Sequence, residues 1–351
     1  LIVNESGDIT RRIGKPTVPL DQPHEALMKP DGNILIANCR NDTIIEVDPE
    51  GKPIWVYDLR TINWTVVDPT FGENAYITNP HGNDWSHVND VELQTRNGTE
   101  FMLLSIRNFD MIVEVNYTSA VQSNDTDESD ITWYFGYPGN YSMLNHQHNA
   151  DYLVNGNIIV ADSENQRVVE INYATKEIVW ESPASLDLYW VRDADENPSN
   201  PELLLITDSL HHRVIEFNKN SSEITWQYTG NMIQPYQADY LDSGNILIAD
   251  GAGGNIIIVE PTTNSIIRQF RTEHGSYQYV KAIFLSLISL PVFLIVMTLA
   301  KIRVIRGNEI DKKTLAGLFV AGGALVLILG SVIHPSWLLK TIVQMINVIV
   351  R

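Results

Sequence analysis

The side chains of this sequence that could do chemistry recur at matching points of an internal repeat. Five copies of the repeat begin at His24, His87, His148, Arg192 and Tyr236. Imidazoles and guanidiniums brought together can bind a small anion such as sulfate, phosphate or a carboxylate. Histidine can also act as a nucleophile or as a general acid or base near neutral pH. If folding gathers these five positions, they would form a candidate anion-binding or catalytic site.

The repeat itself predicts how the five positions are held. Each copy contains four short strand-like runs, and Asp31-Gly32 and Asn155-Gly156 are pairs that tight hairpin turns favour. Repeats of about 40 residues with four strands each are typical of a β-propeller. Residues 1–13 look like the last two strands of a further copy. The sequence therefore predicts an all-β fold over residues 1–275, a six-bladed β-propeller with one blade incomplete in this chain. In a propeller, the loops that enter the innermost strands open onto one face of the central channel, so we expect the five positions to converge.

A second set of basic residues follows in the next loop of each blade. These are Arg40, Arg107, Arg167, His211, His212 and Arg213. Together with the first set they predict a cationic pocket. The alternative role for Arg167 and Arg213 is to pair with acids of the next blade, and the alternative for His211 and His212 is a place in solvent. Between the repeats, the polar stretch 119–130 is expected to be a solvated hairpin tip.

A metal site is the second interpretation of the histidines. Three imidazoles and a water make the shell of a catalytic zinc ion, which requires donor atoms about 2.1 Å from one point. Adjacent blades around a wide channel make this demanding, so we rank Zn²⁺ below anion binding and predict no other cofactor. The only cysteine, Cys39, follows a strand-like run and is expected to be a buried apolar thiol.

Several segments resemble one known family, the aryl sulfotransferases of the bacterial, nucleotide-independent type. The segments are NDWSHVNDVE (83–92), FMLLSIRNFDMIVEVN (101–116), ITWYFG (131–136) and NHQHNADYL (145–153), within a resemblance that covers roughly residues 22–260. The resemblance implies a six-bladed propeller, here a membrane-anchored, archaeal-like variant. It also implies transfer of a sulfuryl group from an aryl sulfate to a phenolic acceptor through a histidine.

The resemblance further implies roles for individual residues. His87, His148 and Arg167 would contact the sulfate in one cavity and stabilise its developing charge, with Arg107 beside them. The nucleophilic histidine of the family lies in a later blade, and this chain has no secure counterpart. The repeat positions there are Arg192 and Tyr236, and only His211 or His212 could substitute. The alternative is a non-catalytic propeller that binds a ligand or a protein at the cell surface, or a metal-dependent lyase or hydrolase.

Charge divides the chain into two parts. The net charge is −19, and the stretch 280–351 carries eight Lys and Arg against two acids, so the remainder carries −25. Such an acidic surface repels the phosphates of nucleic acids, which excludes them as expected partners. The expected partners are small aromatic sulfates and phenols for the propeller, and membrane lipid for the basic, apolar tail.

The tail predicts membrane attachment. Residues 280–300 and 314–333 are long and apolar enough to be transmembrane helices. The basic loop 301–313 between them should be cytoplasmic, which puts the propeller on the extracytoplasmic face of the cell membrane. The remaining residues, 334–351, have the pattern of an amphipathic tail along the interface. Eight Asn-X-Ser/Thr sequons, all before residue 280, favour an N-glycosylated extracellular domain.

Overall fold

The computed structural model describes residues 2–3, 9–14, 16–230 and 232–271. The predicted membrane helices at 280–300 and 314–333, the loop 301–313 and the tail 334–351 lie outside these residues. In the part of the chain that is described, no helix has the length and apolar character needed to cross a membrane. The chain divides into two compact units, and the first, residues 1–249 with 257–270, contains every site residue discussed below.

The fold is built almost entirely from antiparallel β-sheet. One sheet has two strands, β1 (Ile2–Val3) and β2 (Ile9–Arg11). Five sheets have four strands each. Their strands are β3 (Pro23–Met28), β4 (Ile34–Asn38), β5 (Thr43–Val47) and β6 (Pro53–Asp58); β7 (Val88–Arg96), β8 (Thr99–Ile106), β9 (Met111–Asn116) and β10 (Ile131–Gly136); β11 (Ala150–Tyr152), β12 (Ile158–Asp162), β13 (Arg167–Asn172) and β14 (Glu177–Glu181); β15 (Val191–Asn197), β16 (Asn200–Asp208), β17 (Arg213–Asn218) and β18 (Glu223–Tyr228); and β19 (Pro235–Tyr240), β20 (Ile246–Asp250), β21 (Asn255–Glu260) and β22 (Ser265–Arg271).

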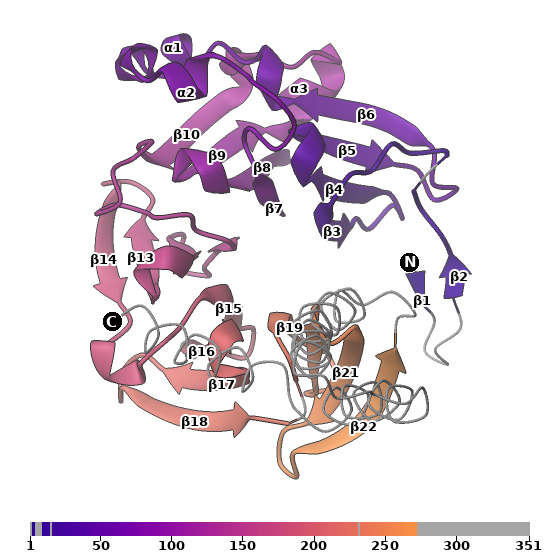
Figure 1. Ribbon diagram of the computed structural model, residues 1–351, viewed down its shortest axis with the longest axis vertical. Helices are drawn as coiled ribbons and strands as arrows, with labels where there is room; N and C mark the ends of the chain where they lie inside the picture. The colour runs from indigo at the N-terminus through magenta and orange to yellow at the C-terminus, as the bar shows by residue number, and fades with distance from the viewer. Residues whose placement is uncertain (1, 4–8, 15, 231, 272–351) are drawn as a thin grey trace, which may run out of the picture. The chain divides into compact units, whose positions relative to one another are not determined.

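The five sheets correspond one to one with the five predicted repeat copies. Within each sheet the strands pair in sequence order, and the first strand of each faces the middle of the arrangement (Figure 1). This is the blade order of a β-propeller, so the prediction of an all-β, propeller-like fold is confirmed. Residues 1–13 do form two strands, and Ile2 and Ile13 pack against the buried Ile34 and Val47 of the first sheet. The sixth blade as a whole stays a prediction.

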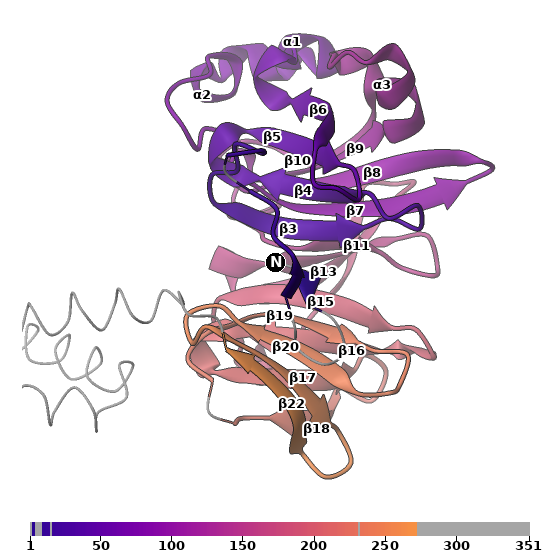
Figure 2. The ribbon, with the colours of Figure 1, turned by 90° about the vertical axis from the view of Figure 1, so that its right-hand side faces the viewer.

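Apolar side chains between neighbouring sheets make the core. The largest cluster joins the first two sheets and includes Leu35, Tyr57, Trp85 and Phe109. Short helices sit beside the outer strands β6 and β10 of these two sheets (Figures 1 and 2). They are α1 (Trp64–Val67), α2 (Ala75–Thr78) and α3 (Tyr117–Ser123).

The prediction of a solvated hairpin tip at residues 119–130 is confirmed in part. The segment joins the paired strands β9 and β10, and residues 121–125 are exposed, but residues 119–123 complete α3 rather than a plain turn. The first turn of α3 is capped by the Asn116 side chain, which accepts from the Ser119 N–H at 3.0 Å. Tyr117 and Ala120 are buried, and the Trp55 indole donates to the Ala120 carbonyl at 3.3 Å. Tyr117 and Ala120 are three residues apart in an otherwise polar segment, so they face the same side of α3.

Candidate functional site

Buried aspartates fix the loops that present the repeat positions. Asp42 Oδ1 accepts the backbone N–H of Ser86 at 2.7 Å, directly before His87. Asp208 Oδ1 accepts the backbone N–H of Tyr189 at 2.8 Å, three residues before the fourth repeat position. Both carboxylates are fully buried, so each bond is a charge-assisted one shielded from water. The loop at the entrance of each inner strand therefore has little freedom.

A second set of bonds aligns the inner strands with one another. Side-chain oxygens near the start of one inner strand accept the N–H of an alanine on the next. The pairs are Asp90 with Ala150 (2.8 Å), Asn149 with Ala194 (3.3 Å) and Asp193 with Ala238 (2.7 Å). Each alanine lies two residues after its repeat position, so these bonds hold His148, Arg192 and Tyr236 at one level of the channel.

Two residues at this level adopt a costly backbone conformation. His87 has φ 49° and Trp190 has φ 59°, in the left-handed region that bulky L residues avoid. The surrounding hydrogen bonds hold them there. Strain of this kind is commonly found where side chains must be aimed at a ligand.

The five repeat positions lie together, as the sequence predicts. The ring centroid of His24 lies 5.1 Å from that of His87 and 5.5 Å from that of His148. His148 and Tyr236 are 4.7 Å apart by the same measure, and the guanidinium carbon of Arg192 is 4.7 Å from the Tyr236 ring. We call these five side chains the channel ring.

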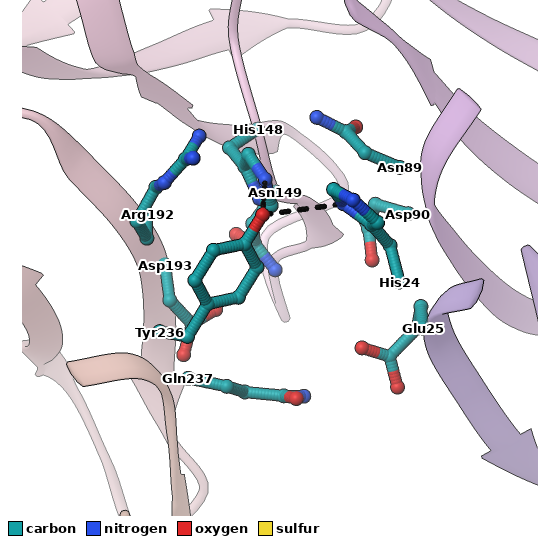
Figure 3. A pocket seen from close by; sticks show the side chains of 10 residues that line it. All are labelled: His24, Glu25, Asn89, Asp90, His148, Asn149, Arg192, Asp193, Tyr236 and Gln237. Atoms are coloured by element: carbon teal, nitrogen blue, oxygen red, sulfur yellow. Dashed lines mark hydrogen bonds between the residues drawn. The ribbon is translucent and has the colours of Figure 1, made fainter. Parts of the chain in front are cut away.

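Tyr236 stands between two histidines of the channel ring. Its hydroxyl lies 2.7 Å from His148 Nε2 and 3.2 Å from His24 Nδ1. Figure 3 shows the hydroxyl pointing to the space between these two imidazoles, with the Arg192 side chain beside it. The arrangement matches the reach that a nucleophile and its general base require.

Arg192 is a buried cation whose hydrogen-bonding capacity is not used. Its side chain is only 7% exposed, and neither Nε nor Nη1 has a hydrogen-bond partner among the described residues. The guanidinium packs 3.4 Å from the Trp190 ring centre. Burial lowers the pKa of Arg192 to about 10, so the group still carries its charge at neutral pH. A buried guanidinium with free donors is an expected feature of an anion site.

The histidines are neutral, which corrects the prediction of a pocket that is cationic throughout. Burial, followed by the nearby His87 and Arg192, lowers the pKa of His24 to about 3. Burial is also the main reason why the pKa values of His87 and His148 are lowered. The positive charge in the ring itself therefore comes from Arg192, while the imidazoles offer neutral nitrogens.

Below the channel ring lies a layer of carboxyl groups that the sequence analysis missed. Glu25, Asp90 and Asp193 line the same cavity as His24 and Arg192 (Figure 3). Burial raises the pKa of Glu25 to about 7, and it raises that of Asp90 and Asp193 well above the ordinary value. The signal was present, because an acid follows closely after the repeat position of every copy. The cavity has a volume of about 20 Å³, enough for about one water molecule.

Two more predicted residues have charged neighbours at the channel ring. His87, a member of the ring, has its Nδ1 2.6 Å from Asp84 Oδ1, an ion-pair contact without hydrogen-bond geometry. Arg107 donates to Asn108 at 2.9 Å and lies 3.9 Å from Glu164. Both basic groups are close enough to contribute to the lowered pKa of His148.

Arg167 is not brought to this cavity. Its guanidinium pairs with Asp162 at 2.7 Å and Glu181 at 2.8 Å, and it donates to the carbonyls of Ser142 and Met143. These four partners occupy its donors, so the role that the structure gives it is to hold the loop before β11. Of the three residues expected to share one cavity, only His148 lines it, whereas His87 and Arg167 do not. The guanidinium of the channel ring is Arg192.

The histidines of the other loop also have partners away from the ring. His211 is an exposed residue paired with Asp208 Oδ2 at 2.9 Å, and His212 Nδ1 is 2.6 Å from the Ile233 carbonyl oxygen. Neither lines the cavity of the channel ring. His146 lines a different hollow of about 380 Å³ together with Tyr76 and Tyr141.

One group of side chains near the ring has the donor types that zinc takes. Donor atoms of His24, Cys39 and His87 all lie within 4.8 Å of one another. The zinc site predicted from the sequence has three imidazoles with His148 as the third, whereas here a buried thiol takes that place. Desolvation and the neighbouring Asp84 both raise the pKa of Cys39, which favours its protonated form over the thiolate that binds metals.

Known protein families give an independent view of the same region. Residues 11–147 match the model of the Arylsulfotransferase (ASST) family. The match covers less than half of the chain, includes His24, His87 and Arg107, and ends one residue before His148. No curated protein matches this chain.

Solved structures resemble the chain in fold. A streptogramin B lyase structure has a TM-score of 0.50 and 14% identity, and the likeness covers 78% of this chain and 75% of that one. Virginiamycin B lyase from Staphylococcus aureus has a TM-score of 0.47 and 13% identity over 72% and 70%. At such low identity, the first of these speaks for the propeller-like fold alone.

Proposed function

We propose that the protein is an aryl sulfotransferase, which transfers a sulfuryl group from an aryl sulfate to a phenol at the channel ring. The observation that carries this proposal is Arg192, a buried guanidinium with two unpaired donors beside neutral imidazoles. The match of residues 11–147 to the arylsulfotransferase family supports the same chemistry. A sulfate ester would supply the negative charge and the acceptor oxygens that these unpaired donors require.

Each residue of the site has its own role in the proposed reaction. Arg192 binds sulfate oxygens through Nε and Nη1 and stabilises the charge that grows on them during transfer. His87 and His148 contact the sulfate as neutral donors, and Arg107 adds long-range attraction. Arg192 takes the role first expected of Arg167.

Release of nitrophenol tests the proposal. The full chain is incubated with 4-nitrophenyl sulfate, with and without phenol, and absorbance reports the product. We expect release that depends on the phenol acceptor and falls at least about 100-fold in Arg192→Met, since one transition-state donor is worth about 10²–10³. His211→Asn is the control, because this exposed residue lies outside the ring and should retain activity. A folded protein that binds the ester without releasing nitrophenol would instead be a non-catalytic ligand-binding propeller.

The zinc alternative has its own observation and its own test. The donors of His24, Cys39 and His87 lie close together, so metal analysis of the purified protein is informative. Stoichiometric zinc that is lost in Cys39→Ser would favour a metal-dependent lyase or hydrolase over the sulfotransferase.

We also propose the setting predicted from the sequence. The propeller is six-bladed, N-glycosylated and extracytoplasmic, and residues 280–300 and 314–333 anchor it in the cell membrane. Recovery of the full chain in the membrane fraction, with the propeller accessible to protease added to intact cells, tests this arrangement. Recovery in the soluble fraction would contradict it.

A further inference from the structure

The unassigned part of the proposed reaction is the nucleophile. The sequence offered no histidine in the later blades at a repeat position, and His211 and His212 lie outside the cavity. The side chain that the fifth blade does place in the ring is Tyr236, from β19. We propose that Tyr236 is the nucleophile of the proposed sulfuryl transfer and carries the sulfuryl group as a tyrosine O-sulfate between the two half-reactions.

The first support is the position of the hydroxyl between two bases. Tyr236 Oη lies 2.7 Å from His148 Nε2 and 3.2 Å from His24 Nδ1, distances at which a proton can pass directly. Phenol oxygens become effective nucleophiles when an adjacent base removes the proton. The ring supplies that base twice.

The second support is that both imidazoles are neutral, so each keeps one nitrogen as an acceptor. Burial keeps the pKa of His148 well below its usual range, and that of His24 at about 3. Since so low a pKa makes an imidazole a weak base, the proton passes from Tyr236 as its oxygen attacks the sulfur, and the charge of the sulfate stabilises the imidazolium that forms. Backbone bonds at the start of β11 and β19 fix the partners, since the N–H of His148 donates to the Ala161 carbonyl at 2.9 Å and that of Ala238 to Asp193 at 2.7 Å.

The third support is the charge next to the phenol ring. The Arg192 guanidinium lies 4.7 Å from the ring centre and opposes the effect of burial, which raises the pKa of Tyr236. A cation at this place stabilises phenolate as it forms, and it also attracts the sulfate ester whose sulfur must be attacked. One residue therefore serves the nucleophile and the electrophile together.

The step balances with no further reactant than water. Tyr236 Oη attacks the sulfur as its proton passes to His148 Nε2. The bond between sulfur and the aryl oxygen breaks, and the leaving phenolate departs with the electron pair and takes a proton from water, while His148 keeps the proton of Tyr236. In the second half-reaction the acceptor phenol gives its proton to the hydroxide so formed, and its oxygen attacks the sulfur from the same far side. The Tyr236–sulfur bond then breaks, and Tyr236 recovers its proton from His148.

Peptide mass spectrometry of the intact full chain tests this assignment. The protein is mixed with 4-nitrophenyl sulfate in the absence of phenol, quenched early, digested and mapped. We expect an added mass of one SO₃ on the peptide that contains Tyr236, and loss of that mass when phenol is supplied before the quench. Tyr236→Phe should lose the modification and slow nitrophenol release by at least about 100-fold.

Tyr240→Phe is the matched control. Tyr240 lies on the same strand, but its hydroxyl is 2.9 Å from Glu216 and not in the channel ring, so this variant should keep both the modification and the release. Modification of a histidine, or wild-type release by Tyr236→Phe, would overturn the role of Tyr236 and leave the sulfotransferase proposal in place. No release by the folded wild-type protein would overturn both.

Discussion

Replacing Arg192 by Met should cost the protein little or no stability while removing its affinity for a sulfate ester. The side chain is buried, and two of its donor nitrogens have no partner among the described residues. Folding therefore removes the guanidinium from water, and the hydrogen bonds of these two nitrogens to water are not replaced by hydrogen bonds within the described part of the protein. Met keeps much of the volume without the charge, so the unfolding free energy should change little.

The magnitude follows from the electrostatics of the site. Burial lowers the pKa of Arg192 from 12.5 to about 10. At about 1.4 kcal/mol per pKa unit, this costs on the order of 3 kcal/mol. Packing against Trp190 and Tyr236 returns about 0.5–2 kcal/mol for each cation–π contact. The two contacts together return about 1–4 kcal/mol, so the net change for the Met variant lies between about −1 and +2 kcal/mol, or roughly −4 to +8 °C in Tm for a domain of this size.

Arg167→Met provides the opposite case in the same protein. This guanidinium is paired with Asp162 and Glu181, and it donates to two backbone carbonyls. Its loss leaves the buried Asp162 carboxylate without its cation, so stability should fall by about 3 kcal/mol or more. Ligand affinity should change little once the loss of fold is taken into account.

Thermal unfolding of the three proteins, with and without 4-nitrophenyl sulfate, measures both effects. A ligand that binds only the folded state raises the Tm. At a ligand concentration of 100 times Kd, it adds about 2.7 kcal/mol to the unfolding free energy. Wild type and Arg167→Met should show this rise, and Arg192→Met should not. If Arg192→Met is destabilised like Arg167→Met and still responds to the ester, the assignment of Arg192 as an unpaired anion-binding group is refuted.

Two other predictions concern pH and glycosylation. The pKa of Glu25 is raised to about 7, so its carboxyl group is neutral below that pH and becomes an anion above it. Because the anion repels a sulfate ester, kcat/KM should fall from pH 6 to 8. The variant Glu25→Gln should show a smaller fall. Between about pH 4.5 and 7, Glu25 is protonated in the folded state and ionised in the unfolded state. The stability that this proton contributes is therefore lost as the pH rises from about 4.5 to 7. Tm measured over this pH range should fall in the wild type and fall less in Glu25→Gln. Glycopeptide mass spectrometry should find sugar on the exposed sequons at Asn97 and Asn220, and not on Asn116, whose side chain caps α3; sugar at Asn116 alone would refute the exposure argument.

The five sheets could be predicted because a blade is a local structure. Its four strands follow one another along the chain, and short turns such as Asn155-Gly156 set their pairing. The same logic located the channel ring, since equivalent positions of equivalent blades must converge.

The mistake over Arg167 was avoidable from spacing. Asp162 and Arg167 are five residues apart around a tight turn, and Asp208 and Arg213 repeat the arrangement with the same 2.7 Å contact. A pair that recurs in two blades at one spacing indicates a structural role. The neutral state of the histidines could not have been predicted, since it depends on how completely other blades exclude water from them.

The two layers of the channel set the conditions that the proposed substrate must meet. Arg192 carries the charge that would attract the sulfate group, while burial raises the pKa of Glu25, Asp90 and Asp193, so that largely protonated carboxyl groups below the ring leave this attraction unopposed near neutral pH. In the proposed reaction the sulfate meets the Tyr236 hydroxyl, which His148 and His24 hold between them. An in-line attack from that oxygen requires the leaving phenol to lie on the far side of the sulfur, away from Tyr236. The cavity of about 20 Å³ must therefore widen before an aryl sulfate can take this position.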